Sequence, residues 1–87
     1  MAKGFEKVLA GCNRIICFAS LGSKDEKVTS HVAEALEGLR EMGYSDEALV
    51  VLQHGASDLE AKQAGFLEWR KFAEALKQAA ILKSTQS

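Results

Sequence analysis

GYSDEALVVLQHGASDLEAKQ, residues 43–63, is the stretch that decides how this chain folds. It contains an apolar run at 48–52, a segment of small residues at 54–57, and then the opening of a new amphipathic pattern. Glycine favours the end of a helix, and serine followed three residues later by glutamate favours the start of one. The sequence therefore predicts that one helix ends at Gly55 and that another begins at Ser57.

Outside this stretch, apolar residues recur three and four positions apart, which is the spacing of amphipathic helices. Ser23 with Glu26 predicts a second capping box, and Gly43 predicts a left-handed helix end. The predicted elements are four helices and a frayed tail: 3–19, 24–42, 46–54, 58–83 and 84–87.

Short loops between helices favour antiparallel neighbours. We therefore expect an all-α fold in which residues 1–87 form a single compact four-helix domain. Three of its helices are amphipathic, the third in the chain is short, and the packing is of the antiparallel up-down type.

Composition narrows the classes of function. Apolar residues make up 47% of the chain and charged residues 26%, there is no proline, and the net charge is −1. Basic residues are interspersed with acidic ones, so no basic block is available for nucleic acid or an anionic membrane. No apolar run is longer than that at 48–52, which is far shorter than the about 20 residues that span a bilayer. We expect no membrane association, and Cys12 and Cys17, which cannot bridge each other on one helix, predict a cytoplasmic protein.

No pattern of catalytic or metal-binding residues is present in the sequence. Zinc sites pair their ligands at short, regular spacings. The cysteines and histidines of this chain do not have such spacings: Cys12, Cys17, His31 and His54. Glycine-rich phosphate loops and the common hydrolase motifs are also missing. We therefore expect a non-enzymatic protein without catalytic residues, cofactor or metal.

The residues Gly55-Ala56-Ser57, followed by an apolar position at Ala61, resemble the turn of a DNA-binding helix-turn-helix. That resemblance implies a DNA-binding regulator that uses segment 48–63. However, the second helix would present Asp58 and Glu60 to the phosphate backbone, whereas affinity for DNA rests on lysine and arginine. Nucleic acid is therefore not the expected partner, and DNA binding is kept as the alternative function.

A surplus of apolar residues predicts a protein partner instead. On a helix as short as 46–54, the run Leu49–Leu52 points all round the axis, so one core cannot bury it completely. Exposed apolar patches and aromatic anchors are typical of protein interfaces. We expect the partner-binding residues to be Phe18, Val50, Leu67, Trp69 and Phe72.

The last predicted helix carries apolar residues at heptad spacing: Leu59, Phe66, Ala73 and Ala80. Such a stripe suits either a homodimer or the protein's own core. The predicted function is that of a small regulator, inhibitor or adaptor that binds another protein, with homodimerisation left open.

Overall fold

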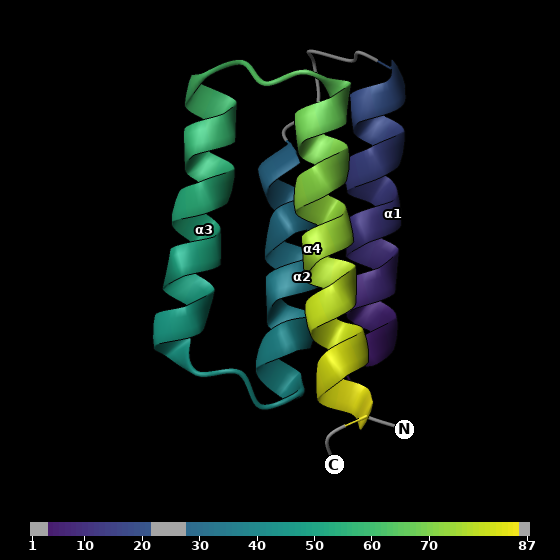
Figure 1. Ribbon diagram of the computed structural model, residues 1–87, viewed down its shortest axis with the longest axis vertical. Helices are drawn as coiled ribbons and strands as arrows, with labels where there is room; N and C mark the ends of the chain where they lie inside the picture. Colours follow the sequence, from purple (N-terminus) through teal and green to yellow (C-terminus); the bar gives the residue numbers. More distant parts are fainter. Residues whose placement is uncertain (1–3, 22–27, 86–87) are drawn as a thin grey trace.

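Four helices and short connections account for residues 4–21 and 28–85, the part of the 87-residue chain that the computed structural model describes. The helices are α1 (Phe5–Leu21), α2 (Val28–Glu41), α3 (Asp46–Ala61) and α4 (Phe66–Thr85). In Figure 1 the chain runs upward through α1 and α3 and downward through α2 and α4. The prediction of an all-α four-helix domain is confirmed.

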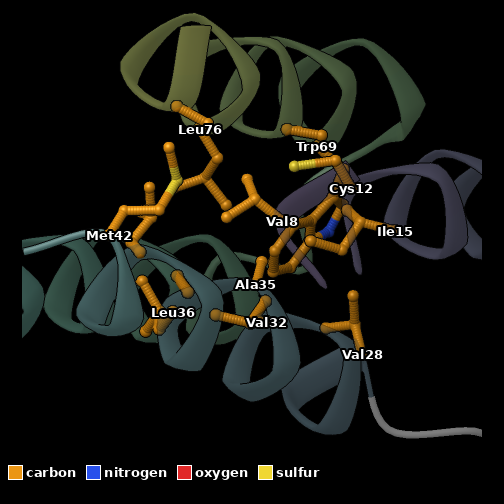
Figure 2. Close-up of a cluster of buried hydrophobic side chains, with 14 residues drawn as sticks. Val8, Cys12, Ile15, Val28, Val32, Ala35, Leu36, Met42, Trp69 and Leu76 are labelled. Atoms are coloured by element: carbon orange, nitrogen blue, oxygen red, sulfur yellow. The ribbon is translucent and has the colours of Figure 1, made fainter. Parts of the chain in front are cut away.

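The buried core is formed almost entirely by α1, α2 and α4. Figure 2 shows side chains of these three helices pointing toward one another, with Cys12 of α1 near Trp69 of α4. The largest fully buried side chains lie on the same three helices: Val8, Cys12, Ile15, Val32, Leu39 and Leu76. Full burial of each large aliphatic side chain contributes about 1.5–3 kcal/mol, so these three helices supply most of the hydrophobic stabilisation.

Glycines let α1 and α2 approach each other closely. A Cβ atom on Gly38 would lie 2.6 Å from the carbonyl oxygen of Gly4, and one on Gly11 would lie 2.8 Å from the amide nitrogen of Ala35. Both distances are too short for real Cβ atoms, so only glycine fits these positions without a shift of the backbone. Three exposed salt bridges also join the two helices: Lys7 to Glu37, Lys7 to Glu41, and Arg14 to Glu34.

Helix α3 is continuous through the segment where the sequence predicts a break. Its inward stripe continues past Gly55, with the half-buried or buried residues Leu49, Leu52, Ala56 and Leu59. A glycine inside a helix costs only about 1 kcal/mol relative to alanine, which the packing of this stripe can offset. Ser57 and Glu60 therefore lie inside α3 and do not begin a new helix.

Two of the predicted helix ranges are consequently wrong. The helix expected at 46–54 extends to Ala61, and the helix expected at 58–83 begins only at Phe66. Residues 55–57 form no turn, so the helix-turn-helix proposed for 48–63 lacks the corner that would place a recognition helix.

The actual corner lies at residues 62–65. The amide of Ala64 donates to the carbonyl of Leu59 at 2.9 Å, and the amide of Gln63 donates to that of Glu60 at 3.1 Å. Gln63 has a φ of 54°, which completes a Schellman-type helix end. Helix α4 then starts with a hydrogen bond from the amide of Trp69 to the carbonyl of Gly65.

Replacing Gln63 with glycine should stabilise the protein by about 0.5–1 kcal/mol. A left-handed conformation costs a non-glycine residue about 1–2 kcal/mol, and the greater freedom of glycine in the unfolded chain offsets part of that gain. The urea midpoint should rise. The matched control is Gly43→Ala at the end of α2, where φ is +104° and the midpoint should fall. A lower midpoint for Gln63→Gly would contradict this helix end.

Tyr44 ties the corner between α2 and α3 to α4. The predicted left-handed end at Gly43 is confirmed, and the amide of Tyr44 donates to the carbonyl of Leu39 at 3.2 Å. The Tyr44 hydroxyl donates to the carbonyl of Ala79 at 2.9 Å, and the ammonium of Lys83 lies 5.5 Å from the centre of the ring. These contacts hold the corner that precedes α3 against the second half of α4.

The helix ends differ from the expected ones by a few residues. The tail expected at 84–87 is helical as far as Thr85, and the hydroxyls of Ser84 and Thr85 donate to the carbonyls of Ile81 and Leu82. Helix α1 extends to Leu21. The predicted capping box at Ser23 and the expected helix start at residue 3 lie outside the described residues.

Candidate interaction surface

The two aromatic residues of α4 that we expected at an interface are covered by the protein itself. Trp69 is only 5% exposed and packs in the core. Phe72 is half-buried, meets the Trp69 ring edge-on at a centroid distance of 6.0 Å, and lies over Gly55 of α3. Trp69 is therefore a core residue and is not part of the candidate surface. Phe72 packs mainly in the contact between α3 and α4.

The apolar stripe of α4 packs inside the monomer. Its buried members face the core: Trp69, Ala73, Leu76 and Ala80. The stripe that we considered for a homodimer is thus buried against the protein's own core. Association through this stripe would require α4 to leave the core.

Phe18 and Leu67 lie apart from the other expected residues. Phe18 is half-buried on α1 and meets His31 of α2 edge-on at a centroid distance of 6.4 Å. Leu67 is 68% exposed, but it stands at the start of α4, beyond the corner at 62–65. Val50 lies about 16 Å before the end of α3, so Leu67 and Val50 do not share a patch. The five residues that we expected at an interface therefore do not form one surface.

Helix α3 carries the clearest exposed apolar pair. Val50 is 51% exposed and Val51 is 69% exposed. Both lie on a row of exposed residues spaced three or four apart along the side of α3 opposite its buried stripe. We call this row the α3 outer face and define it by six residues: Glu47, Val50, Val51, His54, Asp58 and Ala61.

The attachment of α3 to the rest of the protein is narrow. Ala56 is its only buried residue, at 2% exposure, and α3 packs mainly against α2, with a smaller contact to α4. Figure 1 shows α3 at one side of the group formed by α1, α2 and α4. Side chains on the α3 outer face therefore contribute little to the core.

Sequence reasoning missed Val51 because it ended the helix too early. If α3 ended at residue 54, its inward stripe would have only Leu49 and Leu52. Two residues do not decide whether Val51 faces the core or the solvent. Once Ala56 and Leu59 extend that stripe, Val50 and Val51 both fall on the opposite side. Exposed Ile81 and Leu82 near the end of α4 were also missed.

The charges of α3 are all negative. The helix holds four carboxylates and no lysine or arginine: Asp46, Glu47, Asp58 and Glu60. Lys62, just after the helix, pairs with Asp58 at 3.0 Å, and the hydrogen bond to that carboxylate raises the pKa of Lys62. The apolar pair thus lies between two acidic ends.

A shallow groove of about 350 Å³ runs between α2 and α3. Its lining mixes apolar and polar side chains: Ala33, Leu36, Glu37, Arg40, Leu49 and Gln53. The groove is open to solvent and adjoins the side of α3 that packs on α2.

The thiols and imidazoles of the chain are dispersed. Among residues 4–21 and 28–85, no three histidine, cysteine or acidic side chains lie close enough together to hold a metal ion. Burial raises the pKa of the Cys12 thiol to about 11; Lys77 opposes this shift and Glu74 adds to it. Cys12 is therefore a protonated core residue near neutral pH, whereas Cys17 is exposed.

Alkaline pH should destabilise the protein through Cys12. Its ordinary pKa is 9.0 and its folded value is about 11, so between these pH values the unfolded chain releases a proton that the folded protein keeps. This difference favours unfolding by up to about 2–3 kcal/mol by pH 11 and vanishes below pH 9. Urea unfolding of wild type and Cys12→Ala across this range measures it. The alkaline loss should be smaller in the variant, and an identical loss would contradict the burial of this thiol.

No helix in the described part of the chain combines the length and apolarity needed to cross a membrane. A search of protein families, of curated proteins and of solved structures finds no match to this chain.

Proposed function

We propose that this protein is a small non-enzymatic regulator, inhibitor or adaptor that binds another protein through the α3 outer face. The observation that carries the proposal is the exposure of Val50 and Val51, which stand side by side on a helix held to the core along its other side. Burying such a pair against a partner is favourable, at about 25 cal/mol per Å² of apolar surface. A cytoplasmic location is part of the proposal, because Cys12 and Cys17 are spaced on one helix so that they cannot bridge each other, which suits a reducing compartment.

The position of α3 supports this assignment. No residue of the α3 outer face is part of the buried core. The residues of this face can therefore be suited to a partner without loss of fold stability. The stripe of α4 is buried in the monomer, so we propose a different protein as the partner and treat self-association as an outcome to be tested.

The test is binding by the double variant Val50→Ser/Val51→Ser. Its helical circular dichroism should match wild type, because both changes are at exposed sites. Wild-type protein should capture a partner from cells that produce it, and the variant should lose most of that partner. Leu67→Ser is the matched control, since it removes an equally exposed apolar side chain from another surface. Equal capture by the double variant would contradict the proposal.

A further inference from the structure

Charge is segregated between neighbouring helices of this protein. Helix α3 has a net charge of −4 in a chain whose net charge is only −1. Helix α4 carries four basic residues and two glutamates, which give it a net charge of +2. Basic and acidic residues are mixed over the whole sequence, but all the charged residues of α3 are acidic.

The helix dipole explains only half of this acidity. Asp46 and Glu47 occupy the first turn of α3, where the dipole stabilises carboxylates. Asp58 and Glu60 lie near its other end, where the same dipole disfavours them. Lys62 offsets Asp58, but no cation among the described residues lies within ion-pair distance of Glu60. Glu60 therefore destabilises this end of the free helix. The pair of Asp58 with Lys62 is exposed and contributes little, so Asp58 can still gain from a cation supplied from outside.

We propose that the α3 outer face binds a basic amphipathic helix of a partner protein, an inference that rests on the function proposed above. Apolar side chains of that helix would cover Val50 and Val51. Its lysines or arginines would lie against Glu47 at one end and Asp58 at the other, which are about 16 Å apart along α3. A helix of about three turns with an apolar centre and cations at both ends matches this spacing.

The other candidate occupants match the surface less well. Two copies of the α3 outer face would bring like charges together across a two-fold axis, which disfavours a symmetric dimer. The exposed apolar residues of α4 lie at its two ends, with Leu67 at the start and Ile81 and Leu82 about 21 Å further on. Lys71 and Glu74 lie between them, so the middle of α4 offers no apolar centre to a second copy. Nucleic acid and anionic membranes carry the same sign of charge as α3 and are repelled by it.

Fluorescence anisotropy with labelled synthetic peptides tests this partner class. The probe is a peptide of about 14 residues with a leucine stripe at helical spacing and two lysines at each end. At low ionic strength it should bind at least about tenfold more tightly than a matched peptide with glutamates in place of the lysines. It should also bind about tenfold more tightly than a scrambled peptide of the same composition, and salt should weaken its binding.

Variants locate the binding site. Two changes should each weaken binding of the lysine peptide by about tenfold: Val50→Ser/Val51→Ser, and amide replacement of all four α3 carboxylates. The matched control is Glu68→Gln/Glu74→Gln, which neutralises exposed carboxylates of α4 and should leave affinity within about twofold. Circular dichroism of each variant confirms that the helices are intact.

Each outcome supports or overturns the inference. No binding of the lysine peptide at about 1 mM, or equal binding of the glutamate or scrambled peptide, overturns it. Insensitivity to the α3 variants also overturns it, as does a concentration-dependent dimer in light scattering that the valine double variant abolishes. If the natural partner is still captured through Val50 and Val51 while the peptide fails, the inference fails and the proposed function stands. If both fail, the proposed function fails as well.

Discussion

Replacing Trp69 with alanine should remove about 3–5 kcal/mol of stability and lower the melting temperature by at least about 15 °C. Trp69 of α4 is only 5% exposed in the core that α4 shares with α1 and α2, and its ring packs edge-on against Phe72. Truncation removes this apolar contact and leaves a cavity that surrounding helices cannot fill completely. In a domain of this size the loss is a large fraction of the total stability.

The matched control for Trp69→Ala is Leu67→Ala, two residues earlier on the same helix. Leu67 is exposed, so its truncation should change stability by less than about 0.5 kcal/mol. Thermal unfolding followed by circular dichroism measures both variants. If Trp69→Ala melts like wild type and instead loses a partner, Trp69 is a surface residue and the packing of α4 described above is incorrect.

Replacing Gly38 with alanine should destabilise the protein by about 2 kcal/mol or more, although alanine is the better helix former. The new Cβ would lie 2.6 Å from the carbonyl oxygen of Gly4 and 2.8 Å from the amide nitrogen of Val8. Both atoms belong to the backbone of the neighbouring helix segment, so α1 and α2 must move apart. Overpacking of this kind costs about 1–3 kcal/mol or more and outweighs the gain of about 1 kcal/mol in helix propensity.

Gly55→Ala is the same substitution in a different setting and should have the opposite sign. A Cβ at Gly55 meets only the Phe72 ring at 3.6 Å, an ordinary contact. Because Gly55 lies inside α3, alanine should stabilise the protein by about 0.5–1 kcal/mol. Chemical unfolding of both variants decides the matter. Two changes of the same sign would contradict either the close approach of α1 and α2 or the continuity of α3.

The amphipathic stripes were sufficient to predict the helical fold. The spacing of apolar residues predicted amphipathic helices, and the buried side of α1, with Val8, Cys12 and Ile15, has this spacing. Gly43 predicted the end of α2. The error lay at Gly55, where local preference for a helix end was stronger than any signal for continuation. Tertiary packing decides that α3 continues, because Ala56 and Leu59 pack against the other helices only if α3 extends past Gly55.

The candidate surface was only partly predictable for the same reason. Large apolar residues were predicted to bind a partner because of their size. In the structure Trp69 packs in the core, and Phe72 packs in the contact between α4 and α3. Sequence alone could not divide these residues between core and surface, because a stripe as wide as that of α4 serves either purpose. Val50 was identified correctly as exposed, and its neighbour Val51 became recognisable only with the true length of α3.

Above all, α3 must be one continuous helix that is held along a single side and leaves its outer face exposed. Residue-resolved amide hydrogen exchange by NMR tests it most directly. Beyond the first turn of α3, amides from Val50 to Ala61 should be protected without a gap, and they should open with a lower free energy than those of α1, α2 and α4. Unprotected amides at 54–57, or protection of α3 equal to that of α1, would contradict the account.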